Sequence, residues 1–309
     1  MIYDVIVIGG GPSGLSATIY TSRARLKTLL VEKNACGGQM LMTDTIENYP
    51  GFSEGISGFD LAVRLEKQAK YFNAKLVYDE VVSIECNCFF KKVITKDLTY
   101  ETKTIIIATG TFVKKMNVPG ESKFIGKGVS FCAVCDAPFY RDKDVLVIGG
   151  GDSAIQEAVY LSKFAKKVTV IHRRNDLRAM KVLQERVALC KNISVLYNSV
   201  VKEVLGKDSI EKVVINNIKT HENKYLNTNG IFVFIGLIPN TLFLPDVIVD
   251  EATKYIVTDG DMNTFIPGVF ACGDIRKKQL RQIVTATSDG AQAAISAQNY
   301  IEAQEVVTG

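Results

Sequence analysis

The chain of 309 residues lacks tryptophan, has only two histidines, and contains no long apolar or basic run. Its net charge of +4 is spread over interspersed Lys, Arg, Asp and Glu residues, which gives little support for a nucleic-acid or membrane-surface partner. Apolar runs such as Ile231–Ile235 are too short to cross a bilayer. An apolar strand pattern begins almost at once, without a basic and apolar leader, so we expect no secretory signal and a cytoplasmic protein.

Seven cysteines are present, and in a reducing compartment they are not expected to form a structural disulfide framework. The segment Cys132–Asp136 holds a Cys-x-x-Cys pair followed directly by a carboxylate, a pattern typical of a redox or a metal site. Structural zinc needs four ligands, and the other close pair, Cys86 and Cys88, lies far away in a predicted surface hairpin. The pattern therefore favours a redox dithiol, with zinc as the alternative, and we predict no metal site.

The remaining cysteines carry no motif. Cys36, Cys190 and Cys272 stand alone in the sequence and are expected to pack as small apolar residues. For Cys86 and Cys88 we expect ordinary strand positions, and a regulatory thiol is the alternative if they are exposed to solvent.

Two segments of the chain repeat one pattern. Val5–Gly14 and Val145–Ala154 each place three glycines after an apolar stretch, and the similarity continues without a gap through Lys33 and Arg173. Each copy indicates a buried parallel strand, a glycine turn, a helix and a second apolar strand. This order is typical of a βαβ nucleotide-binding unit, and the chain is long enough for two domains. The sequence therefore predicts an α/β protein with two Rossmann-like dinucleotide-binding domains.

The glycines of each copy have separate tasks. The first permits a tight turn, the second lets the backbone approach a pyrophosphate, and the third position lets the helix pack closely on the strand. The start of the helix then offers unpaired N–H groups to the phosphates. These positions are Gly9, Gly11 and Gly14 in the first copy and Gly149, Gly151 and Ala154 in the second.

The residue that follows the second strand core differs between the copies. Glu32 in the first copy can accept hydrogen bonds from ribose hydroxyls, as FAD or NAD requires. The second copy has His172 at this position, followed by Arg173, Arg174 and then Arg178. Guanidinium groups here favour a 2′-phosphate, so we predict NADP(H) over NAD(H). The alternative is that these arginines form an ordinary solvated helix start.

Further apolar strand patterns occur at 105–110 and 232–236, and a last one at 268–274 precedes a helix of small residues expected from Asp289 onward. The last strand and helix must pack on a sheet, and we expect this to be the sheet of the first unit. The second domain is then an insertion, and both crossings contain Pro or Gly as linkers often do. We expect crossings near Thr111–Pro119 and Leu237–Asp246, a divided domain of residues 1–114 and 244–309, and an inserted domain of residues 115–243.

Short motifs accompany these features along the chain: Gly37–Met40, Glu47–Gly51, Gly273–Asp274, Arg281–Gln282 and Asp289–Gly290. Together with the glycine turns, the Cys-x-x-Cys-Asp segment and the arginines, they resemble the low-molecular-weight thioredoxin reductases of the flavoprotein disulfide reductase superfamily. The resemblance implies an FAD-binding domain interrupted by an NADPH-binding domain that carries the redox dithiol. It also implies a homodimer that reduces the disulfide of thioredoxin.

The resemblance further implies which residues hold the cofactors. Asp274 would lie at the ribityl chain of FAD, and Gln282 beside the flavin ring. The residues expected to bind FAD are Gly9, Gly11, Pro12, Ser13, Gly14, Glu32, Gly38, Gln39, Asn48, Thr109, Gly110, Gly273, Asp274, Arg281 and Gln282. Those expected to bind NADPH are Gly149, Gly151, Asp152, Ser153, Ala154, His172, Arg173, Arg174 and Arg178.

The predicted chemistry needs one thiolate that attacks, a second that resolves the intermediate, and a group that moves protons. Cys132 and Cys135 supply the sulfurs, and Asp136 is the nearest acid/base, a role that the resemblance also implies. Both histidines lie elsewhere, since His172 falls at the predicted NADPH site and His221 in a polar stretch. A helix-capping role is the alternative for Asp136.

The dithiol departs from the family pattern at Val134, where a threonine is common. This change removes a hydroxyl between the sulfurs but no reacting group. Ala137–Pro138 also differs from the commonest pattern, so the preference among thioredoxin-like partners stays open, as does the question of which sulfur attacks the partner.

The dithiol and the nicotinamide must both reach the flavin, each to within about 3–3.5 Å of the reacting atom. A dithiol docked on the flavin would exclude the nicotinamide and would be hidden from a protein substrate. We therefore expect the inserted domain to rotate about its two crossings between the half-reactions.

Three other functions compete with an NADPH-dependent thioredoxin reductase. A related flavin disulfide reductase could serve another thioredoxin-like or peroxiredoxin-linked carrier. A redox sensor that binds partners without turnover is disfavoured by the second nucleotide motif, which a sensor does not need. A reductase fed by ferredoxin is disfavoured by Arg173 and Arg174.

Overall fold

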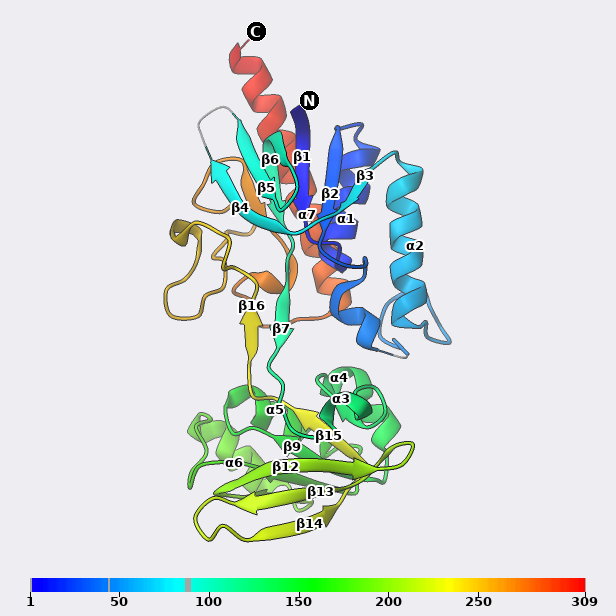
Figure 1. Cartoon of the computed structure of the whole chain (residues 1–309), viewed down its shortest axis with the longest axis vertical. Coiled ribbons are helices and arrows are strands. Elements are labelled where there is room, and N and C mark those ends of the chain that lie inside the picture. Colours follow the sequence, from blue (N-terminus) through cyan, green and yellow to red (C-terminus); the bar gives the residue numbers. More distant parts are fainter. Residues whose placement is uncertain (1, 44, 87–89, 309) are drawn as a thin grey trace. The chain divides into compact units, whose positions relative to one another are not determined.

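The computed structural model describes residues 2–43, 45–86 and 90–308. Contacts divide the chain into two compact units. Unit 1 combines the two ends of the chain, Met1–Phe112 and Ile238–Gly309, and unit 2 is the middle segment Val113–Leu237. In Figure 1, unit 1 therefore carries the blue, orange and red parts of the ribbon, and unit 2 carries the green part.

Unit 1 is built on a seven-stranded sheet. Its strands are β1 (Ile2–Ile8), β2 (Thr28–Glu32), β3 (Lys75–Tyr78), β4 (Val81–Cys86), β5 (Lys91–Thr95), β6 (Thr99–Ile107) and β17 (Val269–Ala271). The order is β3-β2-β1-β6-β5-β4, and β17 pairs in parallel with the second half of β6. The second halves of the central parallel strands, Val5–Ile8 of β1 and Thr104–Ile107 of β6, are fully buried, as expected where both faces of the sheet are covered.

Three long helices pack in unit 1: α1 (Pro12–Arg23), α2 (Gly58–Tyr71) and α7 (Ile283–Thr308), with short 3-10 helices η1 (Gly38–Met42), η3 (Asp246–Ile248) and η4 (Gly273–Ile275). The predicted return of the last strand and helix to the first sheet is confirmed by the pairing of β17 with β6. The helix begins at Ile283, however, earlier than the predicted start near Asp289. Its first turns are rich in β-branched residues, whose weak helix propensity is overridden by packing.

Unit 2 contains a five-stranded parallel sheet of order β11-β10-β9-β15-β8 and a three-stranded antiparallel sheet of order β12-β13-β14. The strands are β8 (Val129–Ser130), β9 (Asp144–Ile148), β10 (Lys167–Ile171), β11 (Ile193–Leu196), β12 (Ser199–Gly206), β13 (Ile210–Asn217), β14 (Asn223–Asn227) and β15 (Gly230–Val233). The helices are α3 (Glu121–Phe124), α4 (Ala133–Asp136), the 3-10 helix η2 (Ala137–Tyr140), α5 (Asp152–Leu161) and α6 (Lys181–Leu189).

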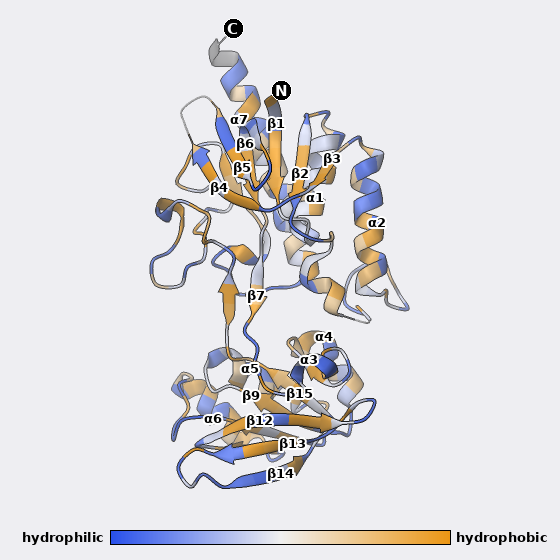
Figure 2. Cartoon of the chain, viewed as in Figure 1, coloured by the Kyte–Doolittle hydropathy of each residue, from blue (hydrophilic) through white to orange (hydrophobic). Residues whose placement is uncertain are grey.

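The segments β1-α1-β2 and β9-α5-β10 are equivalent βαβ units, since both strand pairs are parallel and both helices follow a glycine turn. Figure 2 shows strands such as β1 in unit 1 and β15 in unit 2 as mainly apolar ribbons, and α2 with both polar and apolar residues. In the described part of the chain, no helix is long and apolar enough to cross a membrane. The predicted α/β fold with two Rossmann-type units is confirmed.

The chain passes between the units in two short strands, β7 (Thr111–Val113) and β16 (Leu237–Pro239), which pair with each other. A glycine precedes each strand: Gly110 has φ +61° and Gly236 has φ +124°. An ideal Cβ at either glycine would meet no atom within 4 Å. Glycine is therefore required there by the backbone conformation, which other residues rarely adopt, and not by lack of space.

Candidate redox-active and nucleotide-binding sites

Cys132 and Cys135 form a disulfide, with their Cα atoms 5.4 Å apart. Cys132 precedes the short helix α4, and its Sγ accepts a hydrogen bond of 3.2 Å from the backbone N–H of Cys135. Because both sulfurs are bonded to each other, neither is a thiolate ligand for zinc. The arrangement supports the redox interpretation of the Cys-x-x-Cys pair.

Ser130 holds the start of the dithiol segment, a role that the sequence did not predict. Its hydroxyl accepts a hydrogen bond of 3.1 Å from the backbone N–H of Cys132. Ser130 is buried and sits on β8, which pairs with β15 through Phe232. The dithiol is therefore attached directly to the parallel sheet of unit 2.

Asp136 ends α4 and precedes the 3-10 helix η2. Its side chain makes no capping hydrogen bond to η2, so the helix-capping alternative is wrong. Tyr140 lies four residues further on, with its ring packed edge to face on Phe232 at 5.1 Å. Burial and the neighbouring Asp136 raise the pKa of Tyr140 to about 12. Asp136 thus shares its surroundings with a phenol that stays protonated at neutral pH.

The first glycine turn has the geometry expected of a phosphate loop. Gly9 has φ +104°, and an ideal Cβ on it would lie 2.5 Å from the carbonyl oxygen of Ala108. An ideal Cβ on Gly14 would overlap the carbonyl oxygen of Gly9, so the third glycine allows the close packing that the sequence predicted. At Gly11 a Cβ would meet nothing within 4 Å. The space beside Gly11, at the start of α1, therefore suits a close-lying phosphate group.

Glu32 has a second task at this turn. One of its carboxylate oxygens accepts a hydrogen bond of 2.5 Å from the N–H of Gly10, and the other accepts one of 2.9 Å from Asn34. The carboxylate thus ties β2 to the glycine turn and keeps further lone pairs for a ligand. Gly38 brings η1 to the same turn, since its Cβ would lie 3.3 Å from the Cα of Gly11.

The second glycine turn is closed by the loop after β10. The backbone N–H of Arg178 donates a hydrogen bond of 2.8 Å to the carbonyl oxygen of Gly150, and the guanidinium of Arg178 lies beside Gly151. An ideal Cβ on Gly150 would overlap the ring of His172. His172 is therefore a packing partner of the turn, as Glu32 is a hydrogen-bonding partner of the first turn.

The charges of this loop come from its arginines and not from His172. His172 is 4% exposed, and burial together with the neighbouring arginines lowers its pKa. Arg173 and Arg174 are exposed on an irregular loop, and the next helix, α6, begins only at Lys181. The alternative of a solvated helix start is therefore wrong. The loop presents guanidinium groups beside a glycine turn.

Asp152 and Ser153 open α5 next to Ala154. The carboxylate of Asp152 accepts a hydrogen bond of 2.8 Å from the N–H of Met180. It thus attaches α5 to the loop of residues 172–180, here called the arginine loop. Ser153 is exposed, and Ala154 is buried against Gly149, as its predicted packing task requires. The second turn and its arginine loop thus form one connected structure.

At other predicted FAD positions, side chains form hydrogen bonds between segments of unit 1 that are far apart in the sequence. Asn48 donates a hydrogen bond of 3.1 Å to the side-chain oxygen of Gln282. The Gln39 amide donates to the backbone oxygen and the hydroxyl of Thr111, at 2.7 and 2.9 Å. The Thr109 hydroxyl donates to the backbone oxygen of residue 240 at 3.0 Å. These contacts bring segments 39–48, 109–111 and 282 together in unit 1.

Two buried polar atoms near η4 have no partner within the described residues. They are Oδ1 of Asp274 and Nε of Arg281. Burial raises the pKa of Asp274, while Lys278 and Arg281 lower it. Buried polar atoms without partners are costly in a folded protein unless a ligand satisfies them. The donor and acceptor here fit a polar ligand such as the ribityl chain of FAD.

The other cysteines agree in part with the sequence analysis. Cys36 and Cys272 are buried, and burial raises the pKa of each thiol to about 12, so both behave as small apolar residues. Cys190 is half-buried and donates to the carbonyl oxygen of Arg186 at 3.3 Å, so its predicted apolar packing is incomplete. Burial raises the pKa of Cys86. Cys88 lies outside the described residues.

Comparison with known proteins decides the family. The family model of the pyridine nucleotide-disulphide oxidoreductases matches residues 3–290. The thioredoxin reductase of Treponema pallidum is 46% identical over 300 residues, with 97% of both chains covered. This chain belongs to the thioredoxin reductase family. Among solved family members, thioredoxin reductase from Streptococcus pyogenes is 45% identical, has a TM-score of 0.94 and matches over 98% of this chain and 99% of its own.

A second solved family member matches less closely in space. Lactococcus lactis thioredoxin reductase in its FR conformation is 44% identical, and the match covers 97% of this chain and 99% of that one. Its TM-score is 0.66. The two solved reductases are almost equally identical to this chain in sequence, but their TM-scores differ widely. A difference in conformation explains this better than sequence divergence does.

Proposed function

We propose that this chain is an NADPH-dependent thioredoxin reductase that contains FAD. Electrons would pass from NADPH to FAD, then to the Cys132–Cys135 disulfide, and finally to the disulfide of thioredoxin. The observation that carries the proposal is the disulfide at a Cys-x-x-Cys-Asp segment in a chain with two glycine-turn βαβ units. When bound, FAD accepts a hydride from NADPH and can pass both electrons to a disulfide.

Unit 1 would hold FAD. Its pyrophosphate would lie at the open space beside Gly11, where the N–H groups that begin α1 favour negative charge. Glu32 has lone pairs left for the adenosine ribose. Asp274 would accept hydrogen bonds from the ribityl hydroxyls, which would satisfy its buried oxygen. The remaining predicted FAD residues lie on the same segments of unit 1.

Unit 2 would hold NADPH. The space beside Gly151 at the start of α5 would take the pyrophosphate. Arg173, Arg174 and Arg178 would bind the 2′-phosphate, because planar guanidinium groups can bind phosphate oxygens in pairs. His172 would pack against the glycine turn at Gly150. It would contribute no charge, because burial and the neighbouring arginines lower its pKa.

The dithiol would complete two balanced steps. Both electrons from the flavin break the Cys132–Cys135 bond and, with one proton, leave one thiolate and one thiol. Asp136, which directly follows Cys135 in the chain, would move this proton. The thiolate then attacks the thioredoxin disulfide and forms a mixed disulfide. The second sulfur, after losing its proton, attacks this mixed disulfide, so the Cys132–Cys135 bond forms again and thioredoxin leaves with one thiol from that proton and one thiolate, which takes a proton from solvent.

The inserted unit would rotate between these steps about β7 and β16. The two solved relatives with TM-scores of 0.94 and 0.66 support this step, since they share nearly the same identity with this chain.

We also propose that the enzyme is a cytoplasmic homodimer, in keeping with the resemblance and with the reduced thiols of that compartment.

Anaerobic titration of the purified holoenzyme tests the proposal. NADPH should bleach the flavin absorbance, and oxidised thioredoxin should restore it. Replacing Arg173 and Arg174 by glutamine should raise KM for NADPH far more than KM for NADH. Bleaching that thioredoxin cannot reverse would favour another disulfide carrier, and a flavin that NADPH cannot reduce would favour a sensor or a ferredoxin-fed enzyme.

A further inference from the structure

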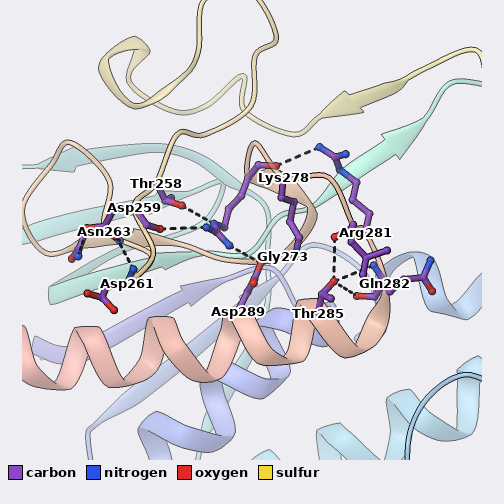
Figure 3. A network of polar contacts seen from close by, with 12 residues as sticks. Thr258, Asp259, Asp261, Asn263, Gly273, Lys278, Arg281, Gln282, Thr285 and Asp289 are labelled. Atoms are coloured by element: carbon purple, nitrogen blue, oxygen red, sulfur yellow. Dashed lines mark hydrogen bonds and ion pairs between the residues drawn. The ribbon is translucent and has the colours of Figure 1, made fainter. Parts of the chain in front are cut away.

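One carboxylate oxygen next to the Gly273–Ile275 turn contacts three donor groups. Oδ2 of Asp289, on the second turn of α7, accepts from the N–H of Gly273 at 3.1 Å and from Nζ of Lys278 at 2.8 Å. It also forms an ion pair of 3.0 Å with Arg276. Figure 3 shows Gly273, Lys278 and Asp289 in this network, with Asp289 on α7. The turn is thus attached to α7 by a charged network.

The network joins two cations to one carboxylate in a largely buried place. The side chains of Arg276 and Lys278 are each 13% exposed, and that of Asp289 is 12% exposed. Arg276 also contacts the hydroxyl of Thr258 at 2.7 Å and the carbonyl oxygen of Asp259 at 3.4 Å, and it helps to lower the pKa of the Asp259 carboxylate. A poorly hydrated cation acts strongly on a neighbouring ionisable group, because screening by water is weak there.

That next group is Asp274, on the same turn. Burial raises the pKa of Asp274, and among the surrounding charges Lys278 lowers it first, Arg281 second, while Asp289 raises it. Tyr255 also faces Asp274, and burial raises the pKa of this phenol, so it adds no charge. Asp274 has a buried oxygen without a partner, the atom that the proposed function assigns to the ribityl chain. Its charge state therefore decides how well it accepts hydroxyl groups.

We propose that Lys278 is a positioning residue for the flavin cofactor, because its ammonium group binds the same Asp289 oxygen as the N–H of Gly273 and so holds Asp274, the next residue of that turn, in place for the ribityl hydroxyls. The inference rests on the proposed function, since it takes Asp274 as a ligand of FAD. It adds a residue outside the resemblance motifs and assigns it a measurable effect on cofactor binding.

Retention of FAD across a pH series tests the role, with the full-length holoenzyme and the fluorescence of released flavin as the readout. In Lys278→Met, Asp274 should take up a proton at a higher pH, so the midpoint of FAD release should move upward by about one pH unit. At neutral pH the dissociation constant of FAD should rise about tenfold. Lys278→Arg keeps the charge and should retain the wild-type midpoint.

Lys277→Met is the matched control. Lys277 is the adjacent lysine, but its side chain is 56% exposed and pairs with Asp250 at 2.9 Å, away from Asp289. This variant should release FAD at the wild-type midpoint. Circular dichroism and binding of NADPH to unit 2 would show whether Lys278→Met is folded. If it is not, Lys278→Arg still decides, because release of FAD at a higher pH in this charge-preserving variant would overturn the proposal.

The measurements distinguish a failure of the proposed function from a failure of the role of Lys278. A wild-type protein that retains no FAD at any pH would overturn the proposed function. A wild-type protein that retains FAD, with equal midpoints in Lys278→Met and Lys277→Met, would overturn the role of Lys278 alone. A raised midpoint in Lys278→Met together with a wild-type midpoint in Lys278→Arg would support it.

Discussion

Single carboxylates in this chain have very different surroundings, and the surroundings decide what each can do. Glu32 is satisfied by two backbone N–H groups, and Asp289 by two cations and one N–H group. Glu157 on α5 has neither, since its Oε2 is buried without a partner in the described residues. Burial alone raises the pKa of Glu157. A carboxylate of this kind is costly in its charged form.

Replacing Glu157 by glutamine should therefore stabilise unit 2 at neutral pH. Because the folded-state pKa of Glu157 lies above its unfolded value, its contribution to stability is fully present in acid and is lost as the pH rises through the folded pKa. Glu157→Gln should raise the free energy of unfolding by about 1 kcal/mol at neutral pH and change it little in acid. Denaturant unfolding followed by circular dichroism at both pH values measures this difference.

Glu185→Gln is the control for this prediction, because Glu185 is exposed on α6 of the same unit. It should leave the unfolding midpoint unchanged at both pH values. Equal behaviour of the two variants, or a loss of stability in Glu157→Gln at neutral pH, would mean that Glu157 has a partner that favours its charge.

At the scale of elements, the parts that the sequence could predict are those whose signal is local. The glycine turns before α1 and α5 and the Cys-x-x-Cys pair each lie within one short segment. Lys278 was missed because its partner is set by folding: it meets Asp289 on a helix that starts earlier than expected. Ser130 was missed for another reason, since its contact with Cys132, two residues on, belongs to no recognised motif. Local patterns carry no record of such contacts.

The crossing strands allow a sharp test of one such local signal. Gly236 has φ +124° and open space around an added Cβ, so alanine there would be strained by backbone conformation alone. Gly236→Ala should lower the free energy of unfolding by about 1–2 kcal/mol. Gly260→Ala is the control, because a Cβ there also meets nothing within 4 Å and its φ is not in the left-handed region. Equal stability of both variants in thermal unfolding would refute the strain argument.

At the scale of the whole molecule, the division into two units allows two different groups to reach the proposed flavin site in turn. The dithiol and the arginine loop belong to unit 2, whereas the proposed flavin site belongs to unit 1. The units are joined by β7 and β16 alone in sequence, and each strand follows a glycine. Few backbone angles then need to change for one unit to turn against the other.

A chemical cross-link between the units should therefore uncouple the two half-reactions. A chain locked in one arrangement can present either the nicotinamide or the dithiol to the flavin, so either flavin bleaching by NADPH or electron transfer to thioredoxin should survive, and steady-state turnover should stop. Anaerobic absorbance measurements separate the two steps, and cleavage of a cleavable linker should restore turnover. Full turnover in completely cross-linked protein would show that both transfers take place in one arrangement, and rotation would then have no part in the mechanism.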